Sequence, residues 1–173
     1  MLDREPYADL PDLPRFDLTS EDVTDGGPLA RAQLSGIMGA GGDDVSPQLS
    51  WSGAPEGTKS YVVTVFDPDA PTPSGFWHWC LSNIPAGVTS LERGAASDPP
   101  AGAVRHRNDG GTDEYIGAAP PPGHGTHRYI VCVTAVDVEE LEVGPDDSPA
   151  TVNFQLFFHG LGRALLTGTH EEQ

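Results

Sequence analysis

Residues 61–71 read YVVTVFDPDAP, a run of β-branched and aromatic residues that ends in a proline-rich turn. A nearly continuous apolar run of this length is typical of a strand that is buried on both faces. Pro68 and Pro71 must end the strand, because proline has no N–H to donate to a sheet ladder. The stretch therefore predicts a central strand that leads directly into a turn containing Asp67 and Asp69.

Two further segments share this apolar character and are also expected to be strands. Residues 76–84 read FWHWCLSNI, and residues 128–138 read RYIVCVTAVDV. Residues 85–112, which lie between them, are rich in glycine, alanine and proline and predict a long loop. The 21 glycines and 17 prolines are typical of short strands joined by turns. Shorter strands are expected at residues 16–18, 49–51 and 115–118, with another near Val104.

One helix is expected near the C-terminus. Ser148 is a favoured N-cap residue, Pro149 suits the first helical position, and Gly168 suits the C-terminal cap. Strands followed by a single docking helix favour a mainly β, sandwich-like fold over alternating βαβ units. The apolar residues at helical spacing, which we expect on one face of this helix, are Phe154, Phe157, Phe158, Leu161 and Leu165.

The length and charge of the chain limit its organisation and its partners. We expect one domain over residues 1–173, with residues 1–15 as an extended N-terminal arm on its body. The net charge of −17 disfavours binding to nucleic acid or to an anionic lipid surface. No stretch approaches the ~20 apolar residues of a membrane span, and the N-terminus lacks the features of a secretion signal. We therefore expect a cytoplasmic protein without integral membrane association.

The two cysteines, Cys80 and Cys132, are expected to be small buried residues without a disulfide. Because strand residues alternate faces, Cys80 shares a face with His78, and the flanking tryptophans take the other face. Cys132 has the opposite parity to His127 and Tyr129. If both histidines point into one pocket, the two sulfurs should therefore lie on different sides of the sheet, unless a bulge intervenes.

Polar side chains gather at the ends of the predicted strands, where sites usually form. Each has a structural alternative. Asp67 and Asp69 can close the proline turn through Asx hydrogen bonds, and His78 can be a satisfied core histidine. His127, which follows His124 by three residues, can be held at the start of its strand by a carboxylate. As a group, two carboxylates and several histidines can bind a metal, transfer protons or hold a phosphate.

Several motifs that would define a chemistry are missing from the sequence. There is no HExxH or paired cysteine motif for zinc and no GxSxG elbow for a nucleophile. There is also no GxxxxGK[ST] phosphate loop and no GxGxxG dinucleotide motif. We therefore expect no catalytic residue, no metal ligand and no cofactor.

Three separate segments match a known pattern in both order and spacing. They are SPQLSW at residues 46–51, DPDAP at residues 67–71 followed by His78, Trp79 and Asn83, and YIGAAPPPGHGTHRYIV at residues 115–131. Together they resemble the phosphatidylethanolamine-binding protein (PEBP) family. The resemblance covers most of the chain between Asp43 and Val138, and the GHG segment is similar to that of the bacterial and archaeal, Raf kinase inhibitor-like branch.

The resemblance implies a Greek-key β-sandwich of two antiparallel sheets, with an edge pocket that accepts phosphate-like and phospholipid head-group anions. It also suggests a cis Ala70–Pro71 bond. Ala119 stands where animal members carry glycine, which would narrow the pocket wall. The animal helix that covers the pocket has no clear counterpart, which argues against a kinase-regulatory role. The residues implied in ligand binding are Asp67, Asp69, His78, Gly117, Ala119, Pro120, Pro121, His124, His127 and Tyr129.

Three functions are compatible with this pattern. The first, which we favour, is non-catalytic binding of a small anionic or phosphorylated ligand. The second is a hydrolase that uses histidine and aspartate as acid and base. The third is an interaction or inhibitor module that acts on a kinase or protease, with an unknown protein partner or a homodimer. For the first function, carboxylates near His78 and His127 would raise the histidine pKa values, so that binding would weaken between pH 5 and pH 8.

Overall fold

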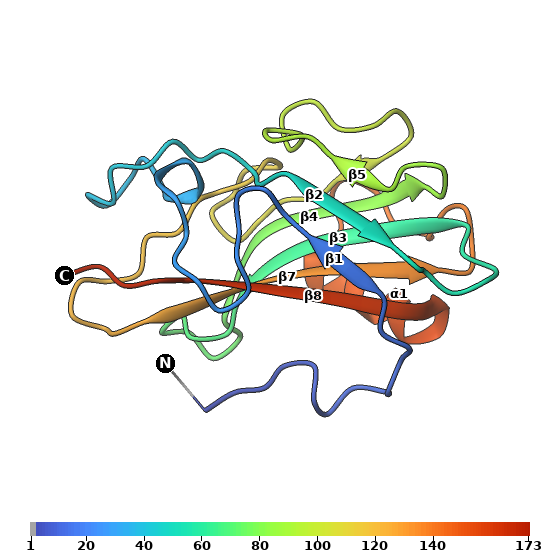
Figure 1. Ribbon diagram of the computed structural model, residues 1–173, viewed down its shortest axis with the longest axis horizontal. Coiled ribbons are helices and arrows are strands. Elements are labelled where there is room, and N and C mark those ends of the chain that lie inside the picture. The colour runs from blue at the N-terminus through green and yellow to red at the C-terminus, as the bar shows by residue number, and fades with distance from the viewer. Residues whose placement is uncertain (1–2) are drawn as a thin grey trace.

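Strand β3 (Ser60–Asp67) is the central strand of a five-stranded antiparallel sheet in the computed structural model, which describes residues 3–173 (Figure 1). The strand order in this sheet is β6-β4-β3-β7-β8, and a smaller sheet has the order β1-β2-β5. The predicted mainly β fold of two antiparallel sheets with one C-terminal helix is confirmed. The other elements are β1 (Asp17–Thr19), η1 (Arg31–Gln33), β2 (Leu49–Ser52), β4 (Phe76–Pro85), β5 (Ser90–Leu91), β6 (Val104–Arg105), β7 (His127–Val136), α1 (Pro149–His159) and β8 (Gly160–His170).

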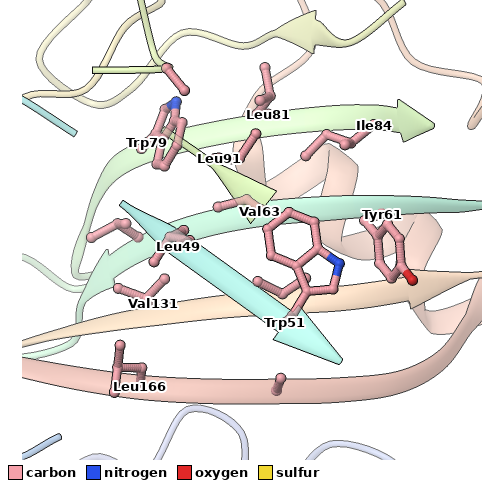
Figure 2. Packing of buried hydrophobic residues seen from close by; sticks show 14 of the residues in the cluster. Leu49, Trp51, Tyr61, Val63, Trp79, Leu81, Ile84, Leu91, Val131 and Leu166 are labelled. Carbon is pink, nitrogen blue, oxygen red and sulfur yellow. The ribbon is translucent and has the colours of Figure 1, made fainter. Parts of the chain in front are cut away.

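The main hydrophobic core lies between the two sheets. Figure 2 shows Leu49 and Trp51 of β2 over Val63 and Val131 of the larger sheet. Trp79 of β4 is fully buried in the same layer. All eight residues of β3 are buried, because the small sheet covers one of its faces and α1 lies on the other. The core thus explains why the segment at residues 61–66 has no polar face.

Helix α1 begins where the sequence predicts, but it ends at His159 and uses a different face. The Ser148 hydroxyl accepts a hydrogen bond from the Thr151 N–H, and Pro149 is the first helical residue. Val152 and Leu156, one turn apart, are buried against the second face of the large sheet. The phenylalanines expected to face the core are instead exposed: Phe154 by 65%, Phe157 by 63% and Phe158 by 61%.

The predicted second half of the helix is the edge strand β8. Residues 160–170 pair with β7 along almost its whole length, from His127↔His170 to Val136↔Gly160. Gly160 and Gly162 weaken a helix at this point, and the unpaired edge of β7 gains a full ladder of hydrogen bonds. Gly168, which was predicted to cap the helix, lies in this strand, where an added Cβ would meet Leu29 at 2.4 Å.

A β-bulge at His78 changes the predicted faces of β4. Val65 pairs with Trp79 and Phe66 with Trp77, so His78 is an extra residue in the ladder. The two tryptophans therefore lie on opposite faces of the sheet, contrary to the prediction.

The same bulge brings the two cysteines to one face of the sheet. Cys80 and Cys132 both pair with Thr64, one from each side, and directly paired residues share a face. Both thiols are free and buried. Two strand spacings separate them by about 10 Å, which is beyond disulfide reach. The prediction that they lie on different sides of the sheet was wrong.

Two further predictions about local structure were wrong. Residues 115–118 form no strand and make only an isolated bridge between Leu34 and Ala118. The Ala70–Pro71 bond is trans. The chain reverses there without a cis bond, because the Asp67 carboxylate accepts the N–H groups of Asp69 and Ala70 and so closes the turn.

The predicted N-terminal arm, apart from Met1 and Leu2, which lie outside the described residues, runs below β8 in the view of Figure 1. Its end pairs with the edge of that strand, since the Arg163 N–H donates to Pro14 and the Phe16 N–H donates to Arg163. Among residues 3–173, no helix has both the length and the apolar character needed to cross a membrane.

Candidate ligand-binding site

A cavity of about 240 Å³ opens where β3 ends and where β4 and β7 begin. Its walls are mostly apolar, and a few polar side chains converge in it. Asp67 and His78 are 3% and 6% exposed, and His127 is 1% exposed. The full lining is Ser35, Ile37, Met38, Asp67, Ala70, Pro71, Thr72, Phe76, His78, Ile116, Gly117, Ala119, Pro120, Pro121, His127 and Tyr129.

Asp67 uses both of its carboxylate oxygens. Oδ1 accepts the backbone N–H groups of Asp69 at 2.7 Å and Ala70 at 3.0 Å. Oδ2 accepts from Nδ1 of His127 at 2.7 Å. The Asx hydrogen bonds that were the structural alternative for Asp67 are therefore present, and they coexist with a direct contact to a histidine of the cavity.

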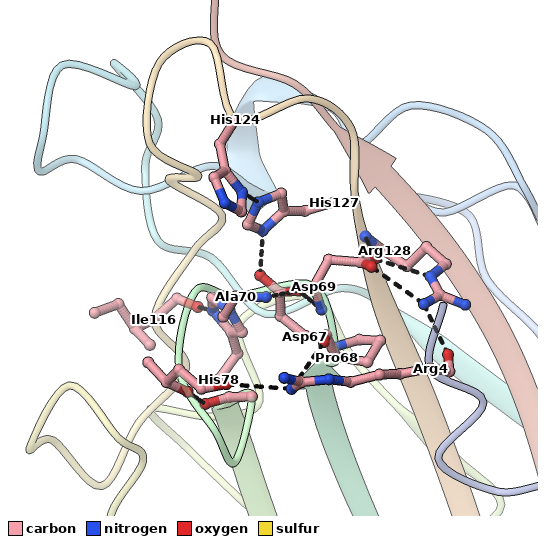
Figure 3. Close-up of polar contacts among 12 residues, drawn as sticks. Arg4, Asp67, Pro68, Asp69, Ala70, His78, Ile116, His124, His127 and Arg128 are labelled. Carbon is pink, nitrogen blue, oxygen red and sulfur yellow. Dashed lines mark hydrogen bonds and ion pairs between the residues drawn. The ribbon is translucent and has the colours of Figure 1, made fainter. Parts of the chain in front are cut away.

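His127 and His124 continue this arrangement outwards (Figure 3). Nε2 of His127 lies 2.8 Å from Nδ1 of His124. Because the Asp67 carboxylate can only accept, Nδ1 of His127 carries a proton, and its Nε2 accepts from His124 when both rings are neutral. His124 is exposed and does not line the cavity. Both ring nitrogens of His127 are thus already engaged.

His78 carries a lone pair rather than a positive charge into the cavity. Nδ1 lies 2.8 Å from the Ile116 carbonyl and must donate to it, so the neutral ring has its lone pair on Nε2. Burial lowers the pKa of His78, and this effect outweighs the carbonyl of Ile116 and the charge of Asp67, both of which raise it. The expectation of a raised pKa for His78 was therefore wrong, because desolvation dominates.

Tyr129 lines the cavity and has a buried hydroxyl that is unsatisfied. The residue is 2% exposed, and its hydroxyl has no hydrogen-bond partner among residues 3–173. Burial raises the pKa of this phenol far above its usual range, so it stays protonated. The Tyr129 ring contacts the His78 ring edge-on, with centroids 5.1 Å apart. A buried donor without a partner is costly, so a ligand that reached this hydroxyl would gain a hydrogen bond from it.

The rim at residues 117–121 offers fewer donors than the sequence suggested. The Gly117 N–H donates to Asp44, and the Ala118 N–H donates to the Gln33 carbonyl. Pro120 and Pro121 have no N–H to offer. Within residues 117–121, only the Ala119 N–H makes none of these hydrogen bonds to the protein, so it is the donor that a ligand could use.

Close packing explains the glycine at position 117. A Cβ added there would lie 2.3 Å from the carbonyl carbon of Leu34. Asp44 joins the two segments, because Oδ1 accepts the Gly117 N–H at 2.7 Å and Oδ2 accepts the Gly36 N–H at 2.8 Å. This contact fixes the loop after Leu34 against the rim, and the sequence pattern did not reveal it.

Asp69 lies outside the cavity and supports its wall from behind. The residue is fully buried, and its carboxylate accepts from Arg128 Nε at 2.8 Å, Arg128 Nη2 at 3.1 Å and the Arg128 N–H at 3.0 Å. Arg128 also pairs with Glu5 of the arm at 2.8 Å, and Arg4 donates to the carbonyl of Thr72 at 3.2 Å. The arm and Arg128 thus hold the turn that forms one side of the cavity.

Sequence reasoning missed the apolar part of the lining. Ile37 and Met38 form an exposed lip, with 54% and 66% exposure. Met38 has φ +56°, and it precedes the glycine run at residues 39–42, which was the available signal for a loop. Phe76 and Ile116 line the interior. Their positions depend on how distant segments pack, so no local pattern identifies them.

A second polar pair, Ser82 and His106, is structural. The Ser82 hydroxyl lies 2.8 Å from His106 Nε2, a distance typical of a nucleophile and its base. Both residues are fully buried, and neither lines the cavity. The other nitrogen, Nδ1, bonds to the Asp147 carbonyl at 2.9 Å, so the pair ties the loop before α1 to β4. Across residues 3–173, no group of three or more potential ligands is placed to hold a metal ion.

Comparisons with known proteins identify relatives over most of the chain. A family model described as phosphatidylethanolamine-binding protein matches residues 19–171. UPF0098 protein YbhB of Escherichia coli is 46% identical over 153 residues, which cover 87% of this chain and 96% of the relative. A putative lipoprotein of Mycobacterium tuberculosis, LppC, is 33% identical over 130 residues, which cover 75% of this chain and 62% of the relative.

Solved structures show the same fold. The crystal structure of Escherichia coli YbcL, described as a new member of the mammalian PEBP family, superposes with a TM-score of 0.89 at 41% identity. The superposition covers 92% of this chain and 99% of YbcL. A putative PEBP homologue from Chlamydia trachomatis gives a TM-score of 0.76 at 29% identity, and covers 92% of this chain and 99% of its own.

Proposed function

Because the chain belongs to the phosphatidylethanolamine-binding protein family, we propose that its cavity binds a small monoanionic oxyacid and does not convert it chemically. The hydrogen phosphate group of a monoester is the ligand group that fits best. The observation that carries the proposal is the Tyr129 hydroxyl, which is buried without a protein partner, among residues 3–173, at a largely apolar cavity.

The polar atoms left over in the cavity define the ligand group. Tyr129 offers a donor, and Nε2 of His78 offers an acceptor. A singly protonated phosphate has the complementary pair, since its P–OH can donate to His78 while another oxygen accepts from Tyr129. A fully ionised phosphate lacks the proton and would also face the Asp67 carboxylate. The apolar walls suit a ligand with a hydrocarbon part.

Binding without catalysis is supported by how the acid–base groups are used. Both oxygens of Asp67 and both ring nitrogens of His127 make hydrogen bonds inside the protein. A general base must reach the proton that it removes, and these hydrogen bonds commit Asp67 and His127 to contacts inside the protein. The pKa of the Tyr129 phenol is raised by burial, so it is a poor nucleophile. A cytoplasmic location is part of the same proposal.

Replacing Tyr129 with phenylalanine should change affinity and stability in opposite directions. We expect the dissociation constant for methyl phosphate to rise about tenfold, because one hydrogen bond to a charged group is lost. We expect the free energy of unfolding without ligand to stay constant or to rise by about 1 kcal/mol, because an unsatisfied buried hydroxyl is removed. Calorimetry and urea unfolding measure the two effects. A loss of stability with unchanged affinity would contradict the proposal.

A second role, recognition of a phosphorylated or acidic residue on a protein partner, is favoured by the exposed lip. Ile37 and Met38 present apolar side chains beside the cavity mouth, where they could contact the residues that flank a phosphoserine. On this role, a phosphoserine peptide should bind at least about tenfold more tightly than free phosphoserine. Equal affinities would restrict the site to small molecules.

A further inference from the structure

Arg163 is a buried cation without a counter-ion in the described part of the chain. It lies on β8 and is 8% exposed. Among residues 3–173, its guanidinium makes no ion pair or hydrogen bond, and Cζ lies 5.2 Å from the centroid of the Tyr7 ring. The other arginine of the same region, Arg15, is exposed. Of these two arginines, Arg163 is therefore the one that is buried without a paired anion among the described residues.

An unpaired buried charge costs folding free energy, and arginine cannot avoid this cost by deprotonation, because it stays protonated in proteins. Proteins normally pair such a group with a carboxylate or satisfy its donors with hydrogen bonds. A cation–π contact with Tyr7 offsets only part of that cost. The guanidinium nitrogens of Arg163 are not fully buried and face a groove, so their N–H donors are available to an anion that is supplied from outside the chain.

A groove of about 100 Å³ gives an anion access to this guanidinium. The N-terminal arm forms one wall, α1 forms another, and β7 and β8 form the floor. Thr134 and Asn153 add polar groups beside Arg163. The remaining lining is apolar and consists of Leu10, Pro11, Leu13, Leu156 and Phe157.

The groove is separate from the cavity at Asp67. Arg163 pairs with Thr134, seven residues along β7 from His127, which corresponds to about 24 Å of strand. Thr134 and Cys132 point to the sheet face that α1 covers, whereas Tyr129 and Val131 belong to the core between the sheets. The two sites thus lie at different ends and on different faces of the large sheet.

We propose that this groove is a second anion site, which binds a carboxylate attached to a short apolar chain, with Arg163 as its counter-ion. The planar guanidinium matches the two oxygens of a carboxylate. The volume suits a few carbon atoms, and the leucines and Phe157 supply apolar walls. Asp9 and Asp12 are exposed on the arm, so a singly charged group is preferred to a phosphate dianion.

The test uses butyrate and its uncharged analogue butyramide, with ionic strength held constant by sodium chloride. Wild-type protein should show a saturable rise of its unfolding midpoint with butyrate and none with butyramide. Arg163→Met should weaken butyrate binding by at least about tenfold, because it removes a charge-assisted pair. Arg15→Met, the matched control, removes an exposed charge from the adjoining segment and should change binding less than about twofold.

Unliganded Arg163→Met should also unfold at a higher temperature than the wild type, because it replaces an unpaired buried cation with an apolar side chain. Acetyl-leucine and acetyl-leucinamide then separate two sources of the same chemistry. Tighter binding of acetyl-leucine than of butyrate assigns the site to a peptide C-terminus, and the reverse order assigns it to a free short-chain acid. Equal responses to butyrate and butyramide, or an unchanged butyrate affinity in Arg163→Met, would overturn the proposal.

Discussion

Replacing Asp67 with alanine is expected to lower the free energy of unfolding by about 3–5 kcal/mol, because three buried N–H donors lose their carboxylate acceptor. The change would leave His127 buried without its carboxylate, which lies 2.7 Å away in the native protein. It would also leave the backbone N–H groups of Asp69 and Ala70 without an acceptor, and their hydrogen bonds to Asp67 close the turn. Urea unfolding followed by tryptophan fluorescence measures the effect.

Two variants control this experiment. Asp67→Asn keeps an oxygen that can accept both N–H groups of the turn, but it places an NH₂ donor where the carboxylate accepted from His127. One contact is lost and two are kept, so its loss of stability should be smaller than that of Asp67→Ala. Asp98→Ala removes a carboxylate from an exposed position and should change stability by less than about 0.5 kcal/mol. If Asp67→Ala resembled Asp98→Ala, the pair with His127 would contribute little, and the cavity would have a different organising contact.

The sequence was sufficient for the features that depend on local pattern. The strands β3, β4 and β7 follow from apolar runs that are buried on both faces, and the turn after β3 follows from its prolines. The polar residues at these strand ends converge because the three strands are neighbours in one sheet. Eight of the ten residues that the motifs implicated in binding therefore line the cavity, and only Asp69 and His124 do not.

Features that depend on competition between distant segments were not predictable in this way. The spacing of Phe157, Leu161 and Leu165 is helical, but residues 160–170 instead form a strand that pairs with the free edge of β7. The bulge at His78 shifts the parity of β4 by one residue, which no alternating pattern reveals. The lip at Ile37 is close to the cavity because Asp44 and backbone hydrogen bonds to Ala118 fix its loop to the rim.

Electrostatics in the cavity also differ from what the residue types suggest. Residue types alone indicate that two carboxylates would keep the histidines protonated and that the positive charge would attract an anion. In the structure, the Asp67 carboxylate instead bonds to the turn and to His127, and Asp69 pairs with Arg128 outside the cavity. Burial lowers the pKa of His78. We therefore expect His78 to recognise a ligand as a hydrogen-bond acceptor, with the proton supplied by the ligand.

This difference leads to a large expected effect of pH on binding. The affinity for methyl phosphate should fall by about two orders of magnitude between pH 5 and pH 8, because its second pKa is about 6 and about 1% of it remains singly charged at pH 8. The monoanion can donate to Nε2 of His78, whereas the dianion cannot and is repelled by Asp67. Calorimetry at constant ionic strength measures the change.

Dimethyl phosphate separates this explanation from protonation of the protein. It carries one negative charge throughout this pH range and has no proton to donate, so it should bind more weakly than methyl phosphate at pH 5 and change less than about threefold by pH 8. Loss of a positive charge from the histidines would instead weaken both ligands in parallel as the pH rises. A parallel decline would restore the charge-based explanation, and affinities that are flat for both ligands would mean that neither His78 nor the charge of Asp67 contributes to recognition.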